Sequence, residues 1–148
     1  MDTPFELRAA NGLIDAALAH ARTQGLAPMT VAVLDAGGHL VAFQREDGAG
    51  ILRPQIAIGK AWGALGMGAG SRHLAQRAAT HPAFVMALSA ASEGRAIPVA
   101  GGVLIRDASG RVLAAVGISG ASPDEDEACA LKGIACAGWT ADTGAIGH

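Results

Sequence analysis

The chain has 148 residues, a length typical of one folded unit, so a single domain over residues 1–148 is predicted. Its net charge of -2 and the lack of any Lys/Arg cluster argue against nucleic acid or an anionic membrane as a partner. The acidic, polar start lacks the features of a secretory signal, and no apolar run approaches the ~20 residues of a membrane span, which predicts a cytoplasmic protein.

The first predicted element is a helix from Pro4 to Gly25. Thr3 is a suitable N-cap, Pro4 suits the first helical position, and Glu6 completes a capping box. Apolar residues then recur at helical spacing until Gly25, a residue type that often ends helices.

Two β-hairpins are predicted from a sequence pattern that occurs twice. The β-rich runs 30–34 and 39–43 flank an Asp-Ala-Gly-Gly turn that begins at Asp35, and residues 103–118 repeat this pattern around Asp107. Both acids are interpreted as turn residues, because Asp opens such turns and Gly supplies the positive φ. One turn type used twice is a simpler explanation than an ancient duplication, and both predict a mainly antiparallel sheet.

Three helices are predicted between the hairpins. The first begins at Pro54, the second has Ser71 as its cap, and the third begins at Thr80 with Pro82. The first of these helices is rich in glycine, and each glycine weakens it by about 1 kcal/mol relative to alanine. We therefore expect another backbone to approach it closely at these glycines, which are Gly59, Gly63, Gly66 and Gly68.

The last helix has the clearest start signal in the chain. Ser122-Pro123-Asp124-Glu125 forms a capping box with Pro at the first helical position, and the helix is predicted to end near Gly138. The element order predicts an α+β fold, in which an antiparallel sheet built from two hairpins carries helices packed on it.

The acidic run that opens this last helix allows two interpretations. Carboxylates suit Mg²⁺ or Ca²⁺, but consecutive helical residues point about 100° apart and cannot converge on one ion. A solvated helix start is therefore favoured, with Asp126 as the member that faces inward. Cys129 and Cys136 lie about 10 Å apart along the same helix axis, which predicts two reduced, half-buried thiols rather than a disulfide.

Few residues suggest catalysis. The histidines have no zinc-binding spacing, and no serine lies in Gly-x-Ser-x-Gly. Gly117-Ile118-Ser119-Gly120 leaves a strand and is interpreted as structural, with Ser119 or Gly120 able to line a ligand slot through backbone N–H groups.

Arg45 and Lys60 are candidates for binding a carboxylate. Arg45 follows the second predicted strand and Lys60 lies on the next helix, so together they could provide a bidentate and a point-charge contact. The alternative is a salt-bridge network of Arg45 with Glu46 and Asp47.

Several short motifs, taken in order across about a hundred residues, resemble the GlcG/HbpS-like family of small haem-binding proteins. The motifs are Val33–Gly38, Arg45–Gly48, Lys60-Ala61, Gly101-Gly102, Gly117–Gly120, and Asp126 with Gly133. The resemblance implies a profilin-like layered α/β fold, assembly into dimers or octamers, and binding of haem or a related tetrapyrrole near subunit interfaces.

We therefore expect a cytoplasmic, homo-oligomeric binding protein for haem or a related tetrapyrrole. An enzyme or accessory factor for a small organic acid such as glycolate is the alternative, with Asp126 as its acid/base group. No catalytic residue or metal ligand is assigned. The predicted ligand-binding residues are Arg45, Asp47, Lys60, Gly101, Gly102, Ser119, Gly120 and Asp126.

Overall fold

The computed structural model describes residues 4–146, and five helices and five strands lie within this range. In chain order they are α1 (Leu7–Thr23), β1 (Thr30–Asp35), β2 (Leu40–Arg45), α2 (Arg53–Met67), α3 (Arg72–Thr80), α4 (Pro82–Ala91), β3 (Gly102–Arg106), β4 (Val112–Ser119), α5 (Pro123–Ala137) and β5 (Thr140–Asp142).

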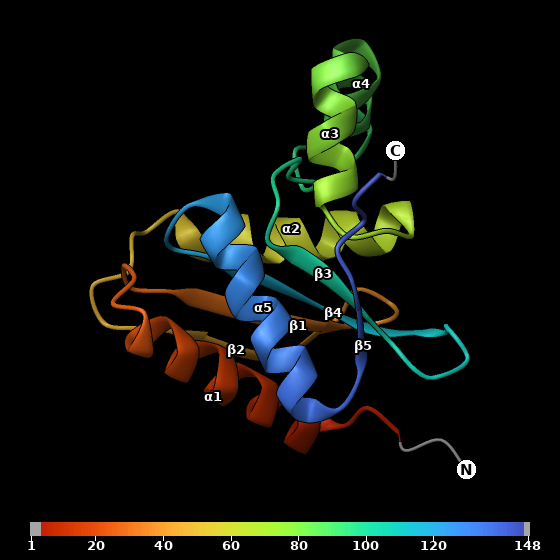
Figure 1. Cartoon of the computed structure of the whole chain (residues 1–148). Helices are drawn as coiled ribbons and strands as arrows, with labels where there is room; N and C mark the ends of the chain where they lie inside the picture. Colours follow the sequence, from red (N-terminus) through yellow and green to blue (C-terminus); the bar gives the residue numbers. More distant parts are fainter. Residues whose placement is uncertain (1–3, 147–148) are drawn as a thin grey trace.

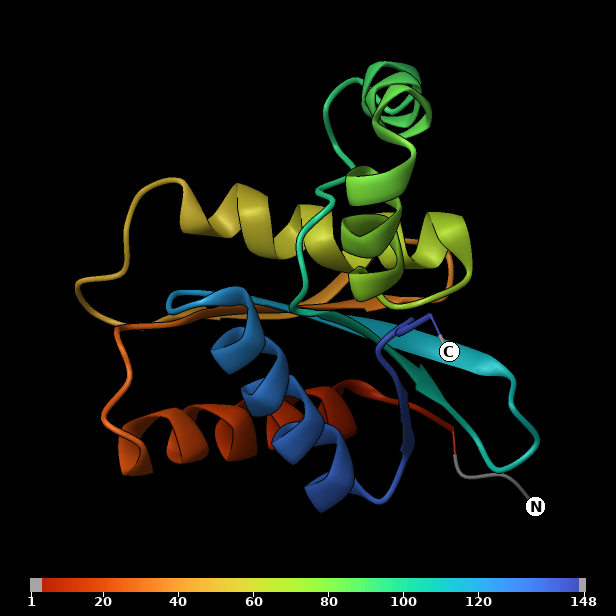
Figure 2. The ribbon, with the colours of Figure 1, turned by 45° about the horizontal axis from the view of Figure 1, so that its top comes forward.

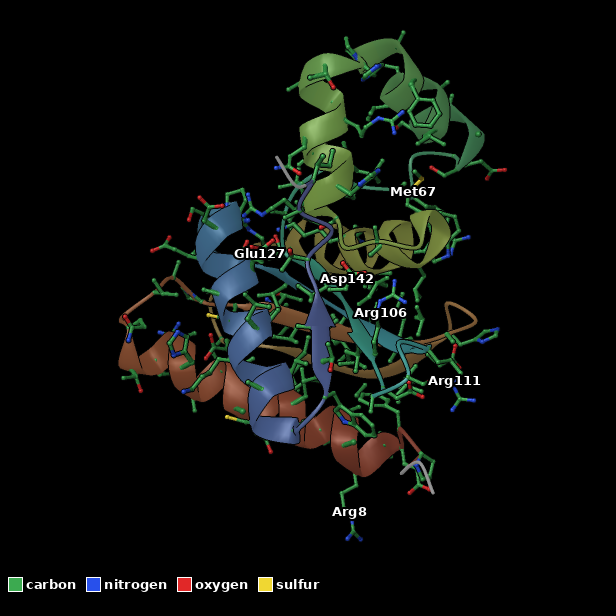
Figure 3. The ribbon with its side chains drawn as sticks, turned by 45° about the vertical axis from the view of Figure 1, so that its right-hand side comes forward. Arg8, Met67, Arg106, Arg111, Glu127 and Asp142 are labelled. Carbon is green, nitrogen blue, oxygen red and sulfur yellow. The ribbon has the colours of Figure 1, made fainter. Side chains whose placement is uncertain are left out.

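The strands form one antiparallel sheet in the order β2-β1-β4-β3-β5 (Figure 1). The two predicted hairpins are β1–β2 and β3–β4, and they join where β1 pairs with β4, so the predicted α+β class is confirmed. The short edge strand β5 was not predicted. An ion pair of 2.9 Å between Arg106 Nη2 on β3 and Asp142 Oδ2 on β5 ties it to the sheet (Figure 3).

Helices cover both faces of the sheet (Figure 2). Helices α1 and α5 pack on one face, where Val31 and Val33 of β1 contribute to the larger core. Helix α2 lies on the other face and packs against a smaller cluster that includes Leu34 and Leu104. Helices α3 and α4 form an arm that extends away from the sheet on the α2 side (Figure 1). None of the helices described is long and apolar enough to span a bilayer.

Both predicted Asp turns are confirmed. Asp35 Oδ1 accepts hydrogen bonds from the backbone N–H groups of Gly37 and His39, at 2.9 and 3.0 Å. In the same way Asp107 Oδ1 accepts from Ser109 and Arg111, at 2.9 and 3.0 Å. Asp35 and Asp107 are therefore structural residues.

The glycines of α2 do not all have the predicted role. A Cβ on Gly59 would lie 2.6 Å from the carbonyl oxygen of Arg95, so a second backbone does approach there. Gly66 and Gly68, by contrast, have open space around them, and the prediction is wrong for both. The closest approach to α2 occurs instead at Gly117 of β4, where a Cβ would overlap the carbonyl of Ala57.

The predicted helix starts differ in accuracy. The capping box of Ser122 is present in full and α5 ends at Gly138, as predicted. Thr3 lies outside the described residues. The predicted start of the first helix at Pro4 is wrong, because Glu6 has an extended backbone at the N-cap position and α1 begins at Leu7. Ser71 occupies the N-cap position of α3, as predicted, but it makes no side-chain capping bond, because its hydroxyl bonds elsewhere in the fold.

The cysteines are not two half-buried thiols. Cys129 is buried in the core, whereas Cys136 is exposed near the C-terminal end of α5, and both are free. Seven residues are almost two full helical turns, so the two thiols lie on nearly the same side of α5, and their exposure differs because they lie at different positions along the helix axis.

Candidate functional site

Most of the predicted site residues surround one buried ion pair between α2 and α5. Lys60 Nζ lies 3.2 Å from Asp126 Oδ2 and donates to the carbonyl oxygen of Ile118 at 2.9 Å. The side chains of Lys60 and Asp126 are only 3% and 1% exposed. Asp126 faces inward, as predicted, and accepts from the backbone N–H groups of Ala121 at 2.8 Å and Gly120 at 3.4 Å.

Burial dominates the electrostatics of this lysine. Desolvation lowers the pKa of Lys60 from its ordinary value, the neighbouring Asp126 carboxylate opposes that change, and the positive charge of Arg53 adds to the lowering. Because Lys60 Nζ already has two protein acceptors and no solvent access, the ion pair is part of the interior in this structure.

The double glycine makes room for this ion pair. Gly101 has a φ of 123°, and a Cβ there would lie 2.8 Å from Lys60 Nζ. A Cβ on Gly102 would meet the backbone carbonyl of Lys60. Ser71 completes the frame, because its Oγ accepts from the backbone N–H of Gly102 at 2.8 Å and donates to the carbonyl of Val99 at 2.6 Å.

Arg45 and Asp47 lie away from this ion pair, at the end of β2. They line an open hollow of about 390 Å³ together with Arg22, Pro28 and Glu46. Arg45 Nη1 donates to the carbonyl of Ala49 at 2.9 Å, so the structure does not bring Arg45 and Lys60 to a common acceptor.

The alternative network of Arg45 with Glu46 and Asp47 is not formed either. Glu46 instead pairs with Arg22 at 3.1 Å and accepts from the backbone N–H of Met29 at 2.8 Å. Sequence proximity suggested the wrong partners, because the contacts of Glu46 are with Arg22 and Met29, which are distant from it in the sequence.

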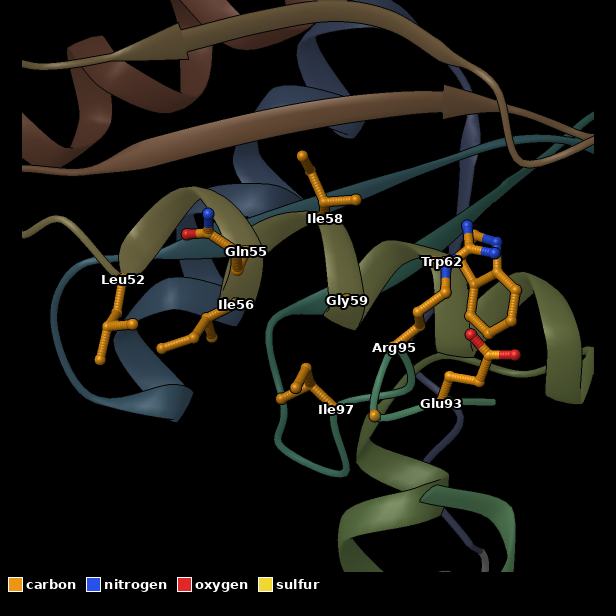
Figure 4. Close-up of a pocket in the computed structure, with 10 residues that line it drawn as sticks. Leu52, Gln55, Ile56, Ile58, Gly59, Trp62, Glu93, Arg95 and Ile97 are labelled. Carbon is orange, nitrogen blue, oxygen red and sulfur yellow. The ribbon is translucent and has the colours of Figure 1, made fainter. Parts of the chain in front are cut away.

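A separate, mostly apolar groove lies along the outer side of α2 (Figure 4). Its volume is about 320 Å³, and it is lined by Leu52 at the N-cap of α2, by Ile56 and Trp62 of α2, and by Ile97 of the segment that returns from α4. The guanidinium of Arg95 lies 3.9 Å from the centre of the Trp62 ring, a cation–π contact at one end of the groove.

Trp62 also joins this groove to a second hollow. That hollow has a volume of about 220 Å³ and lies beneath the arm, where Leu74 of α3 and Leu88 of α4 contribute to its lining. The two hollows thus form a discontinuous apolar surface on the α2 side of the molecule.

Sequence reasoning missed the residues that build the groove. Trp62 and Arg95 are 33 positions apart in the sequence, and no local pattern joins them. A detectable signal was the pair Leu52 and Ile56, which lie four positions apart and therefore share one face at the start of α2.

No group of three His, Cys, Asp or Glu side chains within residues 4–146 is arranged to hold a metal ion. The acidic start of α5 is instead tied to α3. Arg72 Nε donates to Glu127 at 2.9 Å, and its Nη2 reaches Asp124. The prediction of a solvated helix start is therefore only partly right, because Glu127 is buried and paired with Arg72 while Asp124 stays exposed.

The fold and its sites together define a small α+β protein with a layered sheet, a buried Lys–Asp pair and an apolar surface groove. A family model described as haem degrading protein HbpS-like matches residues 5–135. The chain belongs to this HbpS-like family, as its motifs predicted.

Solved structures show the same fold. HbpS of Streptomyces reticuli, in a double-mutant form, is 32% identical, with 92% of this chain and 88% of that chain covered and a TM-score of 0.77. The Klebsiella pneumoniae protein ORFY is 25% identical over 93% of this chain and 94% of that chain, with a TM-score of 0.82. A PduOC–haem complex is 24% identical, with 93% of this chain and 98% of that chain covered and a TM-score of 0.84. No curated protein matches the sequence.

Proposed function

We propose that this protein binds haem or a related tetrapyrrole, and that the groove along α2 receives it. The observation that carries the proposal is an apolar groove with an aromatic ring and one cation, in a member of the HbpS-like family. The solved PduOC–haem complex supports the ligand class, since that relative has the same fold.

The groove has the composition expected for a flat apolar ligand. Ligand pockets of about 300–1,000 Å³ are typically apolar with a few oriented polar groups, and this groove lies at the small end of that range. Trp62 and Ile97 offer surfaces to a macrocycle, while Arg95 offers a guanidinium to a carboxylate at its edge.

These residues fit the organic part of haem. Among the described residues that line the groove, none is His, Cys or Met, the side chains that most often bind haem iron. We therefore assign the groove side chains to the macrocycle and its carboxylates, and assign no ligand to the iron.

Haemin titration tests the proposal. We expect an absorption band that is shifted from that of free haemin and saturates at a fixed ratio of haem to protein. Leu52→Glu should weaken binding, because it places a charge in the groove, whereas Leu7→Glu on α1 is a matched control. Both leucines are exposed, at 68% and 56%, so both variants are expected to fold.

A spectrum identical to that of free haemin would contradict the haem proposal. If haemin bound with equal affinity to the wild type, Leu52→Glu and Leu7→Glu, the protein would bind haem elsewhere than in the groove.

Self-association is the second part of the proposal, and α4 is its proposed surface. Val85 is buried, yet Phe84 and Met86 are 41% and 71% exposed on an arm that extends from the body (Figure 1). Exposed apolar patches of this kind mark interaction sites. We propose that the arm contacts a second copy of the chain and that the assembly is cytoplasmic.

Light scattering tests the assembly. The wild type should exceed the 14.7 kDa of one chain, and Met86→Glu should shift the mass towards that value while Leu7→Glu does not. A wild-type mass of one chain at micromolar concentration would contradict self-association.

A further inference from the structure

Three polar side chains form a row across the end of the sheet, on the face that α2 covers. Thr30 of β1 is paired with Arg45 of β2 on one side and with Ser119 of β4 on the other. Side chains alternate along a strand, so Thr30 shares the face of Leu34, which packs against α2. Strands lie about 4.8 Å apart, which places Thr30 midway between its two neighbours.

The central residue of this row has an unused hydroxyl. Thr30 is 0% exposed, and its Oγ1 has no hydrogen-bond partner among the described residues. Buried side-chain hydroxyls nearly always have a partner, so an orphan group at the centre of a polar row indicates that a ligand atom or water completes it.

Two arginines are associated with this row, one by strand pairing with Thr30 and one by a hydrogen bond to Ser119. Arg53, the first residue of α2, donates through Nη1 to Ser119 Oγ at 3.0 Å, and Arg45 donates through Nη1 to the carbonyl of Ala49 at 2.9 Å. Neither arginine forms an ion pair with any residue of the described chain, including Asp47, which lies two positions after Arg45.

The surroundings add positive potential. Helix α2 begins here with Leu52 at its N-cap position and has no side-chain cap or acidic residue in its first turn, so no carboxylate offsets the positive end of its dipole, although the Arg53 N–H is bonded to the carbonyl of Gly50. The neighbouring Lys60 already uses the Asp126 carboxylate, so Asp126 is not available to Arg53.

We infer that the row Arg45–Thr30–Ser119, together with Arg53, is a binding site for a small oxyanion. The two guanidinium groups and the Thr30 hydroxyl would donate to its oxygens. Carboxylate and phosphate share this chemistry. The site differs from the α2 groove, because Arg53 points towards the sheet whereas Leu52 lines the outer side of the helix.

Calorimetric titration of the full chain with sodium acetate and with inorganic phosphate, against sodium chloride at equal ionic strength, tests the inference. We expect saturable binding of at least one of the two anions and none of chloride. The anion that binds more tightly shows whether the natural ligand carries a carboxylate or a phosphate group. Arg53→Gln should weaken binding by about tenfold or more, since a charge-assisted contact is lost. Arg8→Gln is the matched control, because Arg8 points away from the body at the far side of α1 (Figure 3).

Thr30→Val separates a ligand role from a structural one. It keeps the shape of the side chain and removes only the hydroxyl, so it should weaken anion binding while the thermal midpoint without anion is unchanged or raised. If Arg53→Gln does not fold, the exposed Arg45→Gln provides the same measurement. Absence of saturable binding by both anions, or equal affinities of the Arg53, Arg45 and Arg8 variants, would overturn the inference. The haemin titration is a separate measurement, so its result does not affect the test of the oxyanion site.

Discussion

Replacing Lys60 by methionine removes one partner of the buried ion pair and keeps most of the side-chain volume. Losing one member of such a pair typically costs about 3–5 kcal/mol. We expect about 3 kcal/mol here, because Asp126 keeps its bond of 2.8 Å from the Ala121 N–H, while the Ile118 carbonyl loses its only side-chain donor. At roughly 2–4 °C per kcal/mol, the thermal midpoint should fall by about 6–12 °C.

The chain provides a matched control and a double-mutant cycle for this prediction. Lys132 is the other lysine and is exposed on α5, so Lys132→Met should change the free energy of unfolding by less than about 0.5 kcal/mol. Adding Asp126→Asn to Lys60→Met removes the unpaired charge, so the double variant should cost less than the sum of the two single variants, by about 1 kcal/mol or more.

The pH dependence gives an independent readout of the same lysine. Its pKa is lowered in the folded protein, chiefly by burial, so between that value and its ordinary 10.5 the unfolded chain binds more protons than the folded one. The free energy of unfolding of the wild type should therefore gain a rising contribution across this window, and Lys60→Met should lose it. If urea unfolding shows Lys60→Met to be as stable as Lys132→Met, with the same pH slope as the wild type, the reasoning is refuted.

Three further predictions concern packing, thiol reactivity and capping. Gly117→Ala should destabilise the protein by about 2 kcal/mol or more in urea unfolding, because its Cβ would overlap α2, whereas Gly66→Ala has open space and should stabilise it by up to about 1 kcal/mol. Cys136 should react with a thiol reagent in the native state, whereas Cys129 should react only on unfolding, since burial raises the pKa of its thiol to about 11; equal rates would contradict this. Ser122→Ala should lower the free energy of unfolding by about 1 kcal/mol, and an unchanged midpoint would show that the capping box does not stabilise α5.

Local signals predicted the elements that depend on neighbouring residues. The Asp turns and the Ser122 box are complete within a few positions of the chain, so the hairpins and the start of α5 could be predicted from the sequence. The strand β5 could not, because three residues carry no periodicity and its pairing with β3 depends on an ion pair across 36 positions.

The candidate site was predicted only in part, for the same reason. The inward direction of Asp126 followed from its place in α5, but its partnership with Lys60 spans 66 positions. Arg45 was assigned to Lys60 because a cation at a strand end and a cation on the next helix could share one carboxylate, and only the strand register identifies Thr30 and Ser119 as members of the same row as Arg45. Local sequence patterns do not predict hydrogen bonds between distant segments, and in this protein such bonds determine which charged side chains are in contact.

The arm of α3 and α4 leaves the body and returns to it at almost the same point. The backbone N–H of Ser71 donates to the carbonyl of Gly102 at 2.7 Å, so the two ends of the 30-residue excursion are fastened to each other. Insertions, deletions or substitutions in the arm can therefore be accommodated without altering the order of the strands. Its returning limb carries Arg95 and Ile97, which form one wall of the groove, so a change in how the arm is held is transmitted directly to the width of that groove.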